Sequence, residues 1–365
     1  MRLIPIESVK PNTVLGKTLY DIKGRVLLKS GVVLRERTIE KIKEINILSI
    51  YIIDEYSDEE IEDIIKPEIR QKAISTIKEA FSNIESFSAA KGGKVEFSAK
   101  DQGYFNNIDK MAENIMDDLL NNKDVLLSLV DIRSMNNYMY SHSVNVAVIS
   151  LIIGIALKLD RRKLSSLCMG ALIHDVGKTL VPKEIITKNV ELTPEETEIS
   201  NQHTRLGYKY LADAYNLNSV SKLIVLQHHE RPDGKGYPDG LSNDKIADLS
   251  KIVSIADAYD KLSTDRPNHR AKFPSDVLEY LMANAGKMFD YDIVNIFCRI
   301  VIPFPKGTLV KLSTGEIARV EETITSFPLR PIVKILQSYD ESRITIEINL
   351  IKEISIVIDS IVFDM

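Results

Sequence analysis

The histidines of this 365-residue chain are its clearest candidates for chemistry. Five of the six fall into a pattern that carboxylates punctuate, while the sixth, His269, is expected at the surface. The members of the pattern are His142, His174, Asp175, His203, His228, His229 and Asp257. Imidazole nitrogens and carboxylate oxygens together bind divalent transition metals. The adjacent pairs in the pattern indicate a site for more than one ion.

Two of these candidates lie side by side at one predicted helix end. The apolar helix expected over residues 164–178 ends at His174 and Asp175, and Gly177 is a natural helix stop. Neighbouring helical residues diverge by about 100°, so the imidazole can hold one ion while the carboxylate reaches a second. Asp257 falls among apolar residues of another predicted helix, where burying a carboxylate is costly without a cation. Both carboxylates therefore favour a metal site.

Single members of the pattern also have simpler interpretations. His142 begins an apolar helix, where a lone histidine is more often a core or capping residue, and His203 lies in a polar stretch suited to the surface. The next loop contains Gly234, Gly236 and Gly240, which allow backbone to approach a ligand and fit a plain surface turn equally. The metal interpretation therefore depends on the joint spacing of the whole set.

Composition limits the class of protein. A chain with 44% hydrophobic and 27% charged residues is expected to form two or three soluble globular domains. The net charge of −5 argues against coating a nucleic acid polymer, although a local basic cluster could still bind a small anion. Cys168 and Cys298 lie in apolar helical stretches and are expected to be buried free thiols. Reduced thiols suit the cytoplasm.

No export signal or membrane span is expected. The N-terminus has no apolar signal core followed by a small-residue cleavage site. The longest apolar run, residues 144–157, is too short to cross a bilayer and contains Asn145 and Ser150. It is typical of a buried core helix, so membrane attachment is not expected.

The chain divides by its patterns into four predicted parts. Residues 1–55 are expected to form a small α/β unit, with a hairpin over 17–34, a helix over 35–45 and a strand over 48–53. Residues 56–125 read as a helical linker region. Its helices are expected over residues 67–87, 108–120 and 123–130, with a loop over 88–103.

The remaining two parts differ in class. Residues 126–302 are expected to be all α, and residues 303–365 to form a β-rich unit with strands at 308–312, 316–320, 332–336 and 343–349. The predicted fold is therefore mainly α, a helical bundle with a small β-rich unit at each end.

Three motifs resemble those of HD-GYP phosphohydrolases, a branch of the HD-domain superfamily of metal-dependent enzymes. The first is His174-Asp175-Val176-Gly177-Lys178. The second runs from His228-His229-Glu230-Arg231 to Gly236-Tyr237-Pro238. The third is Ala256-Asp257-Ala258-Tyr259-Asp260 with Asp265-Arg266-Pro267. The resemblance covers roughly residues 131–320, and the two terminal units are only loosely similar to those that flank such domains.

The resemblance implies an HD-type helical bundle around two or three metal ions, usually iron or manganese. The ligands that it implies are His142, His174, Asp175 as the bridge, His203, His228, His229 and Asp257. Residues 132–141 lack the carboxylate found in members with three ions, so two divalent ions are expected. Zinc, nickel and magnesium are also compatible with such ligands. Lys178 and Arg266 match phosphate-contacting positions, and Tyr237 lies in the loop that touches the ligand or a partner protein.

The activity that the resemblance implies is hydrolysis of cyclic di-GMP to the linear dinucleotide pGpG or to GMP. A hydroxide held between the two ions would attack the phosphodiester, and Lys178 would counter the developing charge. Asp260 is a candidate general acid, but orienting a ligand is its more ordinary role.

Two alternatives stay open at the level of the sequence. One is a non-catalytic cyclic dinucleotide receptor, or an adaptor that binds a GGDEF-domain protein through the Gly236-Tyr237-Pro238 loop. The other is an HD hydrolase of another cyclic dinucleotide or nucleotide. The sequence also leaves open which metal is bound in the cell, which signal the N-terminal unit senses and whether the chain forms a homodimer.

Overall fold

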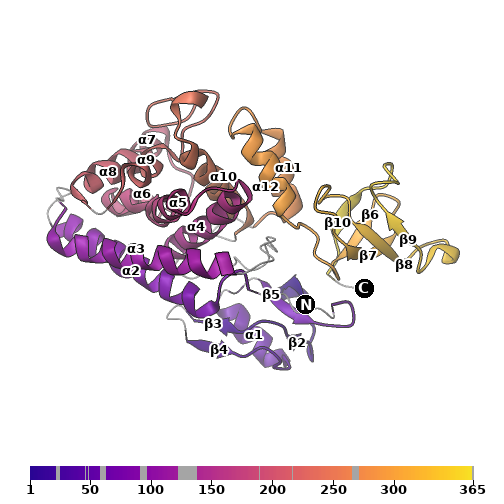
Figure 1. Ribbon diagram of the computed structural model, residues 1–365. Helices are drawn as coiled ribbons and strands as arrows, with labels where there is room; N and C mark the ends of the chain where they lie inside the picture. Colours follow the sequence, from indigo (N-terminus) through magenta and orange to yellow (C-terminus); the bar gives the residue numbers. More distant parts are fainter. Residues whose placement is uncertain are drawn as a thin grey trace.

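The chain forms a helical body with a small β unit next to it at each end of the sequence (Figure 1). The computed structural model describes residues 1–21, 25–45, 47, 49–57, 63–90, 97–121, 138–188, 190–215, 217–264 and 271–363, with the side chains of 88–90 and 138 left out. The predicted fold class, mainly α with a β-rich unit at each end, is confirmed.

The N-terminal unit is a three-stranded antiparallel sheet with one helix packed on it. Its elements are β1 (Arg2–Pro5), η1 (Ile6–Ser8), β2 (Val14–Leu15), β3 (Leu19–Tyr20), β4 (Val26–Leu28), α1 (Glu36–Glu44) and β5 (Ser49–Ile53). The sheet has the order β1-β5-β2, and β3 and β4 form a separate pair. Helix α1 buries Ile39 and Ile42 in the small core of this unit, as their helical spacing predicts.

Two long helices follow, α2 (Pro67–Ala90) and α3 (Ala99–Asn121). The loop predicted over residues 88–103 is wrong at both ends, because α2 continues into it and α3 begins inside it. Asp101 Oδ2 accepts from the backbone N–H of Ser98 at 2.8 Å, and the Ser98 hydroxyl accepts from the N–H of Asp101 at 3.3 Å. These reciprocal bonds act as a capping box that starts α3 early. The helix predicted over 123–130 lies outside the described residues.

The main hydrophobic core unites α2 and α3 with the helices that follow, because its buried residues run from Ile64 to Val301. The predicted linker region at 56–125 and the predicted domain at 126–302 thus share one core. The four domain boundaries themselves stay predictions.

The rest of the helical body is built of short and medium helices. They are α4 (Tyr138–Ala156), α5 (Arg161–Ile173), η3 (Val176–Leu180), α6 (Lys183–Ile186), α7 (Pro194–Asn201), α8 (His203–Tyr210), η4 (Leu211–Asp213), α9 (Ser219–Gln227), η5 (Asn243–Lys245), α10 (Asp248–Ser263), α11 (Pro274–Ala283) and α12 (Tyr291–Ile300). Within the described residues from 138 to 300 only isolated β-bridges occur beside them, so the all-α prediction is confirmed.

Side-chain caps fix where several of these helices start. Asp160 accepts from two backbone N–H groups of the first turn of α5, and Asn218 accepts from one at the start of α9. Thr193 and Glu196 form a capping box at α7. Each cap satisfies N–H groups that have no partner inside the helix. The caps of α5 and α9 matter for function because the opposite ends of both helices carry histidines.

Helix α4 is the central helix of the body. It packs against α5, α10, α2 and α12, and its residues 141–153 are all buried. The window Met139–Ala156 is long and apolar enough to cross a membrane by length and composition, yet 78% of it is buried inside the structure. This burial is that of a core helix, as predicted.

The C-terminal unit is a five-stranded antiparallel sheet with its own core. Its strands are β6 (Leu309–Leu312), β7 (Ile317–Glu322), β8 (Ile332–Gln337), β9 (Glu347–Asn349) and β10 (Ile358–Ile361), in the order β10-β6-β7-β8-β9. The strand predicted over 343–349 is correct only at its end, because η6 (Glu341–Arg343) and a left-handed Thr345 (φ 73°) interrupt it. Strand β10 was missed, since its residues do not alternate between buried and exposed positions.

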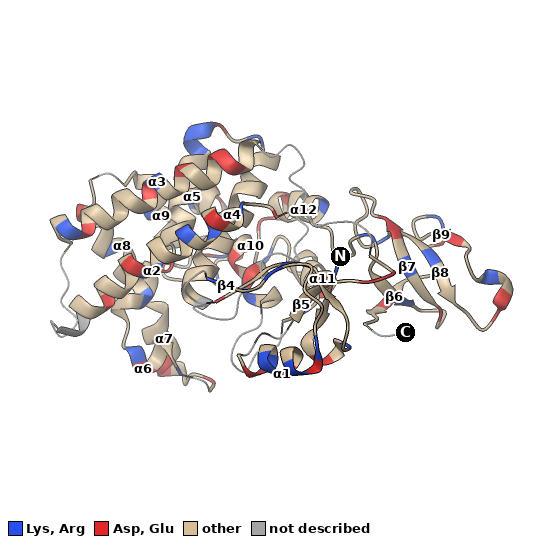
Figure 2. Ribbon diagram, turned by 90° about the horizontal axis from the view of Figure 1, so that it is seen from below, with Lys and Arg blue, Asp and Glu red and all other residues tan. Residues whose placement is uncertain are grey.

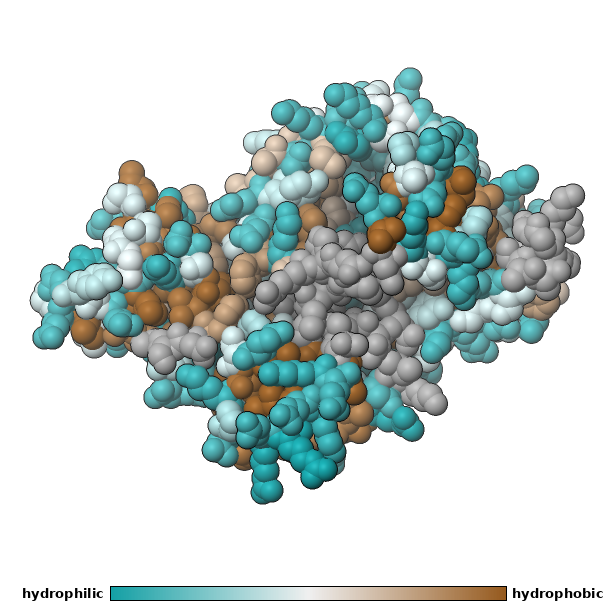
Figure 3. All heavy atoms as spheres, turned by 180° about the vertical axis from the view of Figure 1, so that it is seen from behind, coloured by the Kyte–Doolittle hydropathy of each residue, from teal (hydrophilic) through white to brown (hydrophobic). Residues whose placement is uncertain are grey.

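Acidic and basic residues are interspersed over the helices and sheets, with no single-sign track along the visible described residues (Figure 2). On the face opposite to that of Figure 1, hydrophilic side chains cover much of the surface, and hydrophobic atoms gather in separate patches over the terminal units and part of the helical body (Figure 3). Charges of both signs thus share the surface of the described residues.

Candidate metal centre

Seven side chains from five parts of the helical body meet in its interior. Helix α4 supplies His142, the end of α5 supplies His174 and Asp175, α8 begins with His203, α9 ends at His228 and His229, and α10 supplies Asp257. These are the seven predicted ligands, and the structure brings all of them together. They form two groups, Asp175-His203-His228-His229 and His142-His174-Asp257, within which one donor atom of each residue lies within 4.8 Å of the others.

Three of the histidines are aimed by the ends of helices. Nδ1 of His174 lies 2.7 Å from the carbonyl oxygen of Ala171, and Nδ1 of His203 lies 2.8 Å from that of Ser200. Nδ1 of His228 contacts two carbonyls of the last turn of α9, each at 3.1 Å. A carbonyl oxygen can only accept a hydrogen bond, so Nδ1 must carry the proton. The other ring nitrogen, Nε2, therefore turns a lone pair toward the centre.

The centre contains polar atoms that the protein itself does not satisfy. Nε2 of His174, His203 and His228 and Oδ1 of Asp175 are buried, and among the described residues they have no hydrogen-bond partner. Buried polar atoms without partners are rare in folded proteins, because each costs the free energy of lost hydration. Four such acceptors converging at one place fit a cation. The residues present therefore fit a divalent metal.

Asp175 faces both groups of donors. Its Oδ2 lies 3.4 Å from Nε2 of His174 and 3.8 Å from that of His142, while its Oδ1 lies 3.5 Å from Nε2 of His203. Oδ1 also lies 3.8 Å from Nε2 of His228. Each carboxylate oxygen thus points to a different group, which is the arrangement that a bridging ligand requires.

His142 is held by a second carboxylate on α10. Its Nδ1 lies 2.6 Å from Oδ2 of Asp260, and its Nε2 lies 3.0 Å from Oδ1 of Asp257. The two aspartates are three residues apart, so they lie on the same face of α10. Asp260 is completely buried and orients the imidazole, the role that the sequence favoured for it.

Burial and charge set the protonation of the centre. Burial lowers the pKa of His203 to about 4, and together with the neighbouring histidines it holds the pKa of His228 and His229 well below the ordinary value. Burial also opposes protonation of His174, but the Asp175 and Asp257 carboxylates raise its pKa to about 9, so a metal that binds there would replace the Nε2 proton. Three histidines of the Asp175 group are therefore neutral at pH 7, as a metal ligand must be.

Two lysines bind the carboxylates from the solvent side. Nζ of Lys178 lies 2.5 Å from Oδ2 of Asp175, and Nζ of Lys261 lies 2.7 Å from Oδ2 of Asp257. Burial opposes ionisation of both aspartates, yet the adjacent lysine holds the pKa of each well below its ordinary value. The lysines are 21% and 24% exposed, so each can also meet a ligand from outside. Lys261 was missed in the sequence, although its position four residues after Asp257 was the available signal.

Gly177 has a different role from the helix stop that the sequence suggested. Helix α5 ends at Ile173, and Gly177 lies inside η3 without positive φ. A Cβ on Gly177 would overlap the carbonyl oxygen of His203 and lie 2.6 Å from the backbone nitrogen of Gly207. Its small size therefore allows η3 to touch α8, and this contact brings Asp175 next to His203.

The glycine-rich loop after His229 is anchored on the centre. The buried carboxylate of Glu230 accepts from the backbone N–H groups of Asp239 at 2.7 Å and Leu241 at 2.8 Å. The Tyr237 ring lies over His229 with 4.7 Å between ring centroids, and the Tyr237-Pro238 bond is cis. Sequence reasoning gave Glu230 no separate role, although a carboxylate beside two metal-binding histidines was a signal. The loop thus places Tyr237 at the wall of the site.

A Cβ on Gly236 would overlap the backbone nitrogen of Arg231 and lie 2.5 Å from the carbonyl oxygen of His229. The loop therefore folds back so closely that only glycine fits at this position. Two other residues from the sequence analysis, Arg266 and His269, lie outside the described residues.

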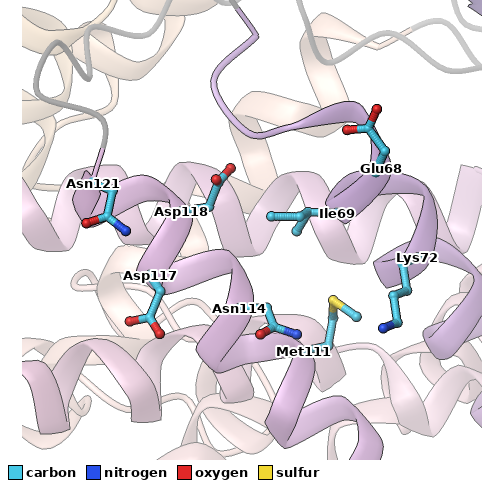
Figure 4. A pocket seen from close by; sticks show the side chains of 8 residues that line it. All are labelled: Glu68, Ile69, Lys72, Met111, Asn114, Asp117, Asp118 and Asn121. Atoms are coloured by element: carbon cyan, nitrogen blue, oxygen red, sulfur yellow. The ribbon is translucent and has the colours of Figure 1, made fainter.

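A groove of about 390 Å³ opens elsewhere, between α2 and α3 (Figure 4). Its lining residues are Glu68, Ile69, Lys72, Met111, Asn114, Asp117, Asp118 and Asn121. None of the seven clustered residues lines it, so this groove is separate from the metal centre.

Two segments of the chain match known protein families. Residues 115–293 match the HD domain family, and residues 309–364 match the KOW domain associated with the HD domain. About half of the chain is thus similar to the HD domain family.

Three relatives illustrate the likeness. A cyclic di-GMP phosphodiesterase of Pseudomonas aeruginosa is 28% identical over 75% of this chain and 64% of its own length. The cyclic di-GMP phosphodiesterase PdeB of Borreliella burgdorferi is 30% identical over 55% of this chain and 52% of its own length. This chain thus spans less than two thirds of the length of each of these two relatives. An HDG"Y"P protein structure from Bdellovibrio bacteriovorus shares the fold, with TM-score 0.53 and 18% identity, covering 81% of this chain and 97% of its own.

Proposed function

We propose that this chain is a metal-dependent phosphodiesterase that hydrolyses cyclic di-GMP. The observation that carries the proposal is the convergence of four buried, unpartnered acceptor atoms in a cluster of histidines and aspartates. Two relatives that bear the name cyclic di-GMP phosphodiesterase support the substrate class.

The seven clustered residues are the proposed ligands of two divalent ions. His142, His174 and Asp257 would hold one ion. The other group, Asp175, His203, His228 and His229, would hold the second, with Asp175 bridging through its two oxygens. A mixed nitrogen and oxygen donor set suits iron or manganese, and also accepts zinc or nickel, while magnesium prefers oxygen alone.

When bound, such ions lower the pKa of a coordinated water and polarise a phosphoryl oxygen. The chain's own residues would do the rest. Lys178 and Lys261 are partly exposed cations beside the two carboxylates and would attract and orient a phosphate. Arg266 is proposed as a further phosphate contact from the sequence motif alone. Tyr237, held on His229, would line the pocket against a guanine or ribose.

The proposed product is the linear dinucleotide pGpG, with GMP as the product of a second cleavage. Cleavage of one P–O bond of the cyclic substrate adds one water and leaves a 5′ phosphate and a 3′ hydroxyl. A leaving oxygen that gains charge in this step would be stabilised electrostatically, and Lys178 is the described cation closest to Asp175.

The test is anaerobic purification of the full chain, metal quantification and a cyclic di-GMP turnover assay. About two ions per chain and metal-dependent turnover are expected, and both should be lost in Asp175→Ala. A matched control is Glu316→Gln in the C-terminal sheet, which removes a buried carboxylate far along the chain and should leave turnover unchanged. Absence of bound metal after reconstitution would refute the ligand assignment.

The same assay separates the alternatives. Tight binding of cyclic di-GMP by metal-loaded protein without turnover would favour a receptor. Faster turnover of a different cyclic dinucleotide, in a panel with 3′,3′-cyclic GMP-AMP and cyclic di-AMP, would identify another HD hydrolase. A GGDEF-domain partner at the Tyr237 loop is proposed only as a secondary role and would be tested by binding with and without Tyr237→Ala.

A further inference from the structure

A chain of hydrogen bonds connects the first turn of α2 with the metal centre. Nη1 of Arg70 donates to Oδ1 of Asn145 at 2.9 Å, and Nδ2 of Asn145 donates to Oδ1 of Asp260 at 2.9 Å. Oδ2 of Asp260 then binds Nδ1 of His142 at 2.6 Å. The three inner residues are 3%, 0% and 1% exposed, so water does not substitute for any of these bonds.

This series of hydrogen bonds is the only connection between Asp260 and a permanent positive charge among the described residues. Besides His142 and Asn145, the carboxylate accepts from the Thr264 hydroxyl at 3.3 Å. A buried carboxylate without a cation is costly, and a guanidinium one residue away polarises the amide that contacts it. Arg70 therefore supports the negative charge of Asp260.

Arg70 and Asp260 both require the same orientation of the Asn145 amide. A guanidinium only donates hydrogen bonds, so the atom of Asn145 that contacts it must be the oxygen. The amide nitrogen must then face Asp260, which only accepts. Asp260 requires the same orientation, so without Arg70 the amide would lose one of its anchors and hold the carboxylate less firmly against His142. The second guanidinium nitrogen, Nη2, is buried without a partner in the described residues. The hydrogen bond from Nη1 to Asn145 is therefore the contact that matters for this guanidinium.

We propose that Arg70 is a positioning residue for the metal ligand His142, acting through Asn145 and Asp260. The inference rests on the proposed metal centre. Helix α2, which begins at Pro67, also reaches the rest of the helical body through the Ser82 and Tyr140 hydroxyls, 3.2 Å apart. A displacement of its first turn would therefore alter how firmly His142 is held.

The experiment compares metal affinities of the full chain. Metal-stripped protein is titrated with Mn²⁺ and with Co²⁺ by calorimetry, and cobalt spectra report the ligand geometry. Arg70→Met keeps the aliphatic stem and removes the guanidinium. Removing a direct partner of a metal-binding histidine typically costs about 10- to 100-fold in affinity, so about 3- to 10-fold is expected two bonds further out. One of the two binding steps should weaken, with an altered cobalt spectrum.

The matched control is Arg161→Met. Arg161 also lies in the first turn of a helix and binds carboxylates, Glu113 and Asp117, but those bonds do not lead to the metal centre. It should leave both binding steps within twofold of the wild type. Thermal unfolding of the metal-free variants shows whether either change merely loosens the fold.

A double-mutant cycle tests the connection itself. If Arg70 acts through Asn145, the affinity of Arg70→Met/Asn145→Ala should equal that of Asn145→Ala alone. Additive losses, or an Arg70→Met variant with wild-type affinity in both steps, would overturn the positioning role. A wild type that binds no metal would overturn the metal centre together with it. A weakened step in Arg70→Met without any turnover by the wild type would support the positioning role and refute only the phosphodiesterase.

Discussion

Two buried carboxylates of this protein have opposite surroundings. Glu316 in the C-terminal sheet is bound by its own neighbours, with Arg343 Nε at 2.6 Å and the Thr314 and Ser338 hydroxyls at 2.7 and 2.9 Å. Both of its oxygens are satisfied. Asp175 in the helical body has one oxygen bound by Lys178, and its other oxygen has no hydrogen-bond partner in the described residues.

This contrast distinguishes structural from functional polar groups. A buried carboxylate that its fold satisfies completely needs nothing else, and it stabilises the turn or strand that it joins. A buried carboxylate that lacks a hydrogen-bond partner, beside three histidines that also lack one, lowers the stability of the fold unless a ligand binds there. Natural proteins keep such groups at sites that bind ligands, so the incomplete carboxylate marks the function.

The largest expected effect separates the two carboxylates by activity. Asp175→Ala should lower cyclic di-GMP turnover by at least about 10³-fold, since it removes the proposed bridging ligand and about 4 kcal/mol of transition-state stabilisation. Glu316→Gln should change turnover less than twofold. Steady-state kinetics of both variants with saturating Mn²⁺ measure this difference, and substantial turnover in Asp175→Ala would remove the distinction between the two sites.

Metal addition should stabilise only proteins with an intact centre. At about 100 times its dissociation constant, an ion raises the free energy of unfolding by about 2.7 kcal/mol. We expect this rise in the wild type and in Glu316→Gln, and none in Asp175→Ala. Urea unfolding with Mn²⁺ and with chelator gives the change in the free energy of unfolding for each of the three proteins. An equal rise in all three proteins would place the binding elsewhere.

A backbone change should damage the metal centre without touching a ligand. Gly177→Ala would force η3 away from the His203 carbonyl, at a cost of about 1–3 kcal/mol of stability and with weaker metal binding. The control is Gly103→Ala in α3, where an added Cβ meets nothing within 4 Å and should stabilise the helix by about 0.5–1 kcal/mol. Unfolding curves and metal titrations of the two variants measure these effects. Unchanged stability and metal affinity in Gly177→Ala would show that the close approach is dispensable.

The smallest effect concerns the pH dependence of the C-terminal sheet. The hydrogen bonds from Arg343 outweigh burial and hold the pKa of Glu316 below its ordinary value. Its stabilisation is therefore complete above the unfolded pKa of about 4.3 and disappears as the pH falls through the lower folded pKa.

Glu316→Gln should cost about 1 kcal/mol at pH 7, a modest value because Arg343 is 39% exposed. The loss should vanish toward pH 3, where the wild-type carboxyl is protonated as well. Urea unfolding of the two proteins at pH 7, 4.5 and 3 measures this convergence. A constant difference at all three values would mean that the charge of Glu316 is unimportant.

Much of the fold was predictable because local patterns match the periods of the elements. The apolar spacing of α1 and α2 and the alternation in β6 to β8 gave elements close to those observed. The predictions failed where a side chain overrode composition, as Ser98 and Asp101 do at the start of α3. They failed as well where a strand depends on its neighbour, as β10 does on β6.

The candidate metal ligands were evident from the sequence, because histidine and aspartate offer suitable donors and their joint spacing resembles that of one family. The sequence also placed three of the histidines near helix ends. The common direction of Nε2 in His174, His203 and His228 could not be predicted, because it depends on carbonyls at folded helix ends that contact Nδ1 of each ring.

Tertiary packing also decided the roles that no motif showed. Gly177 is needed for a contact between segments more than twenty residues apart, and Arg70 reaches Asn145 across 75 positions. Neither relation has a period or spacing that a sequence could display. Local chemistry thus specifies the candidate ligands, while distances between distant segments, fixed by core packing, determine how these ligands are oriented and held.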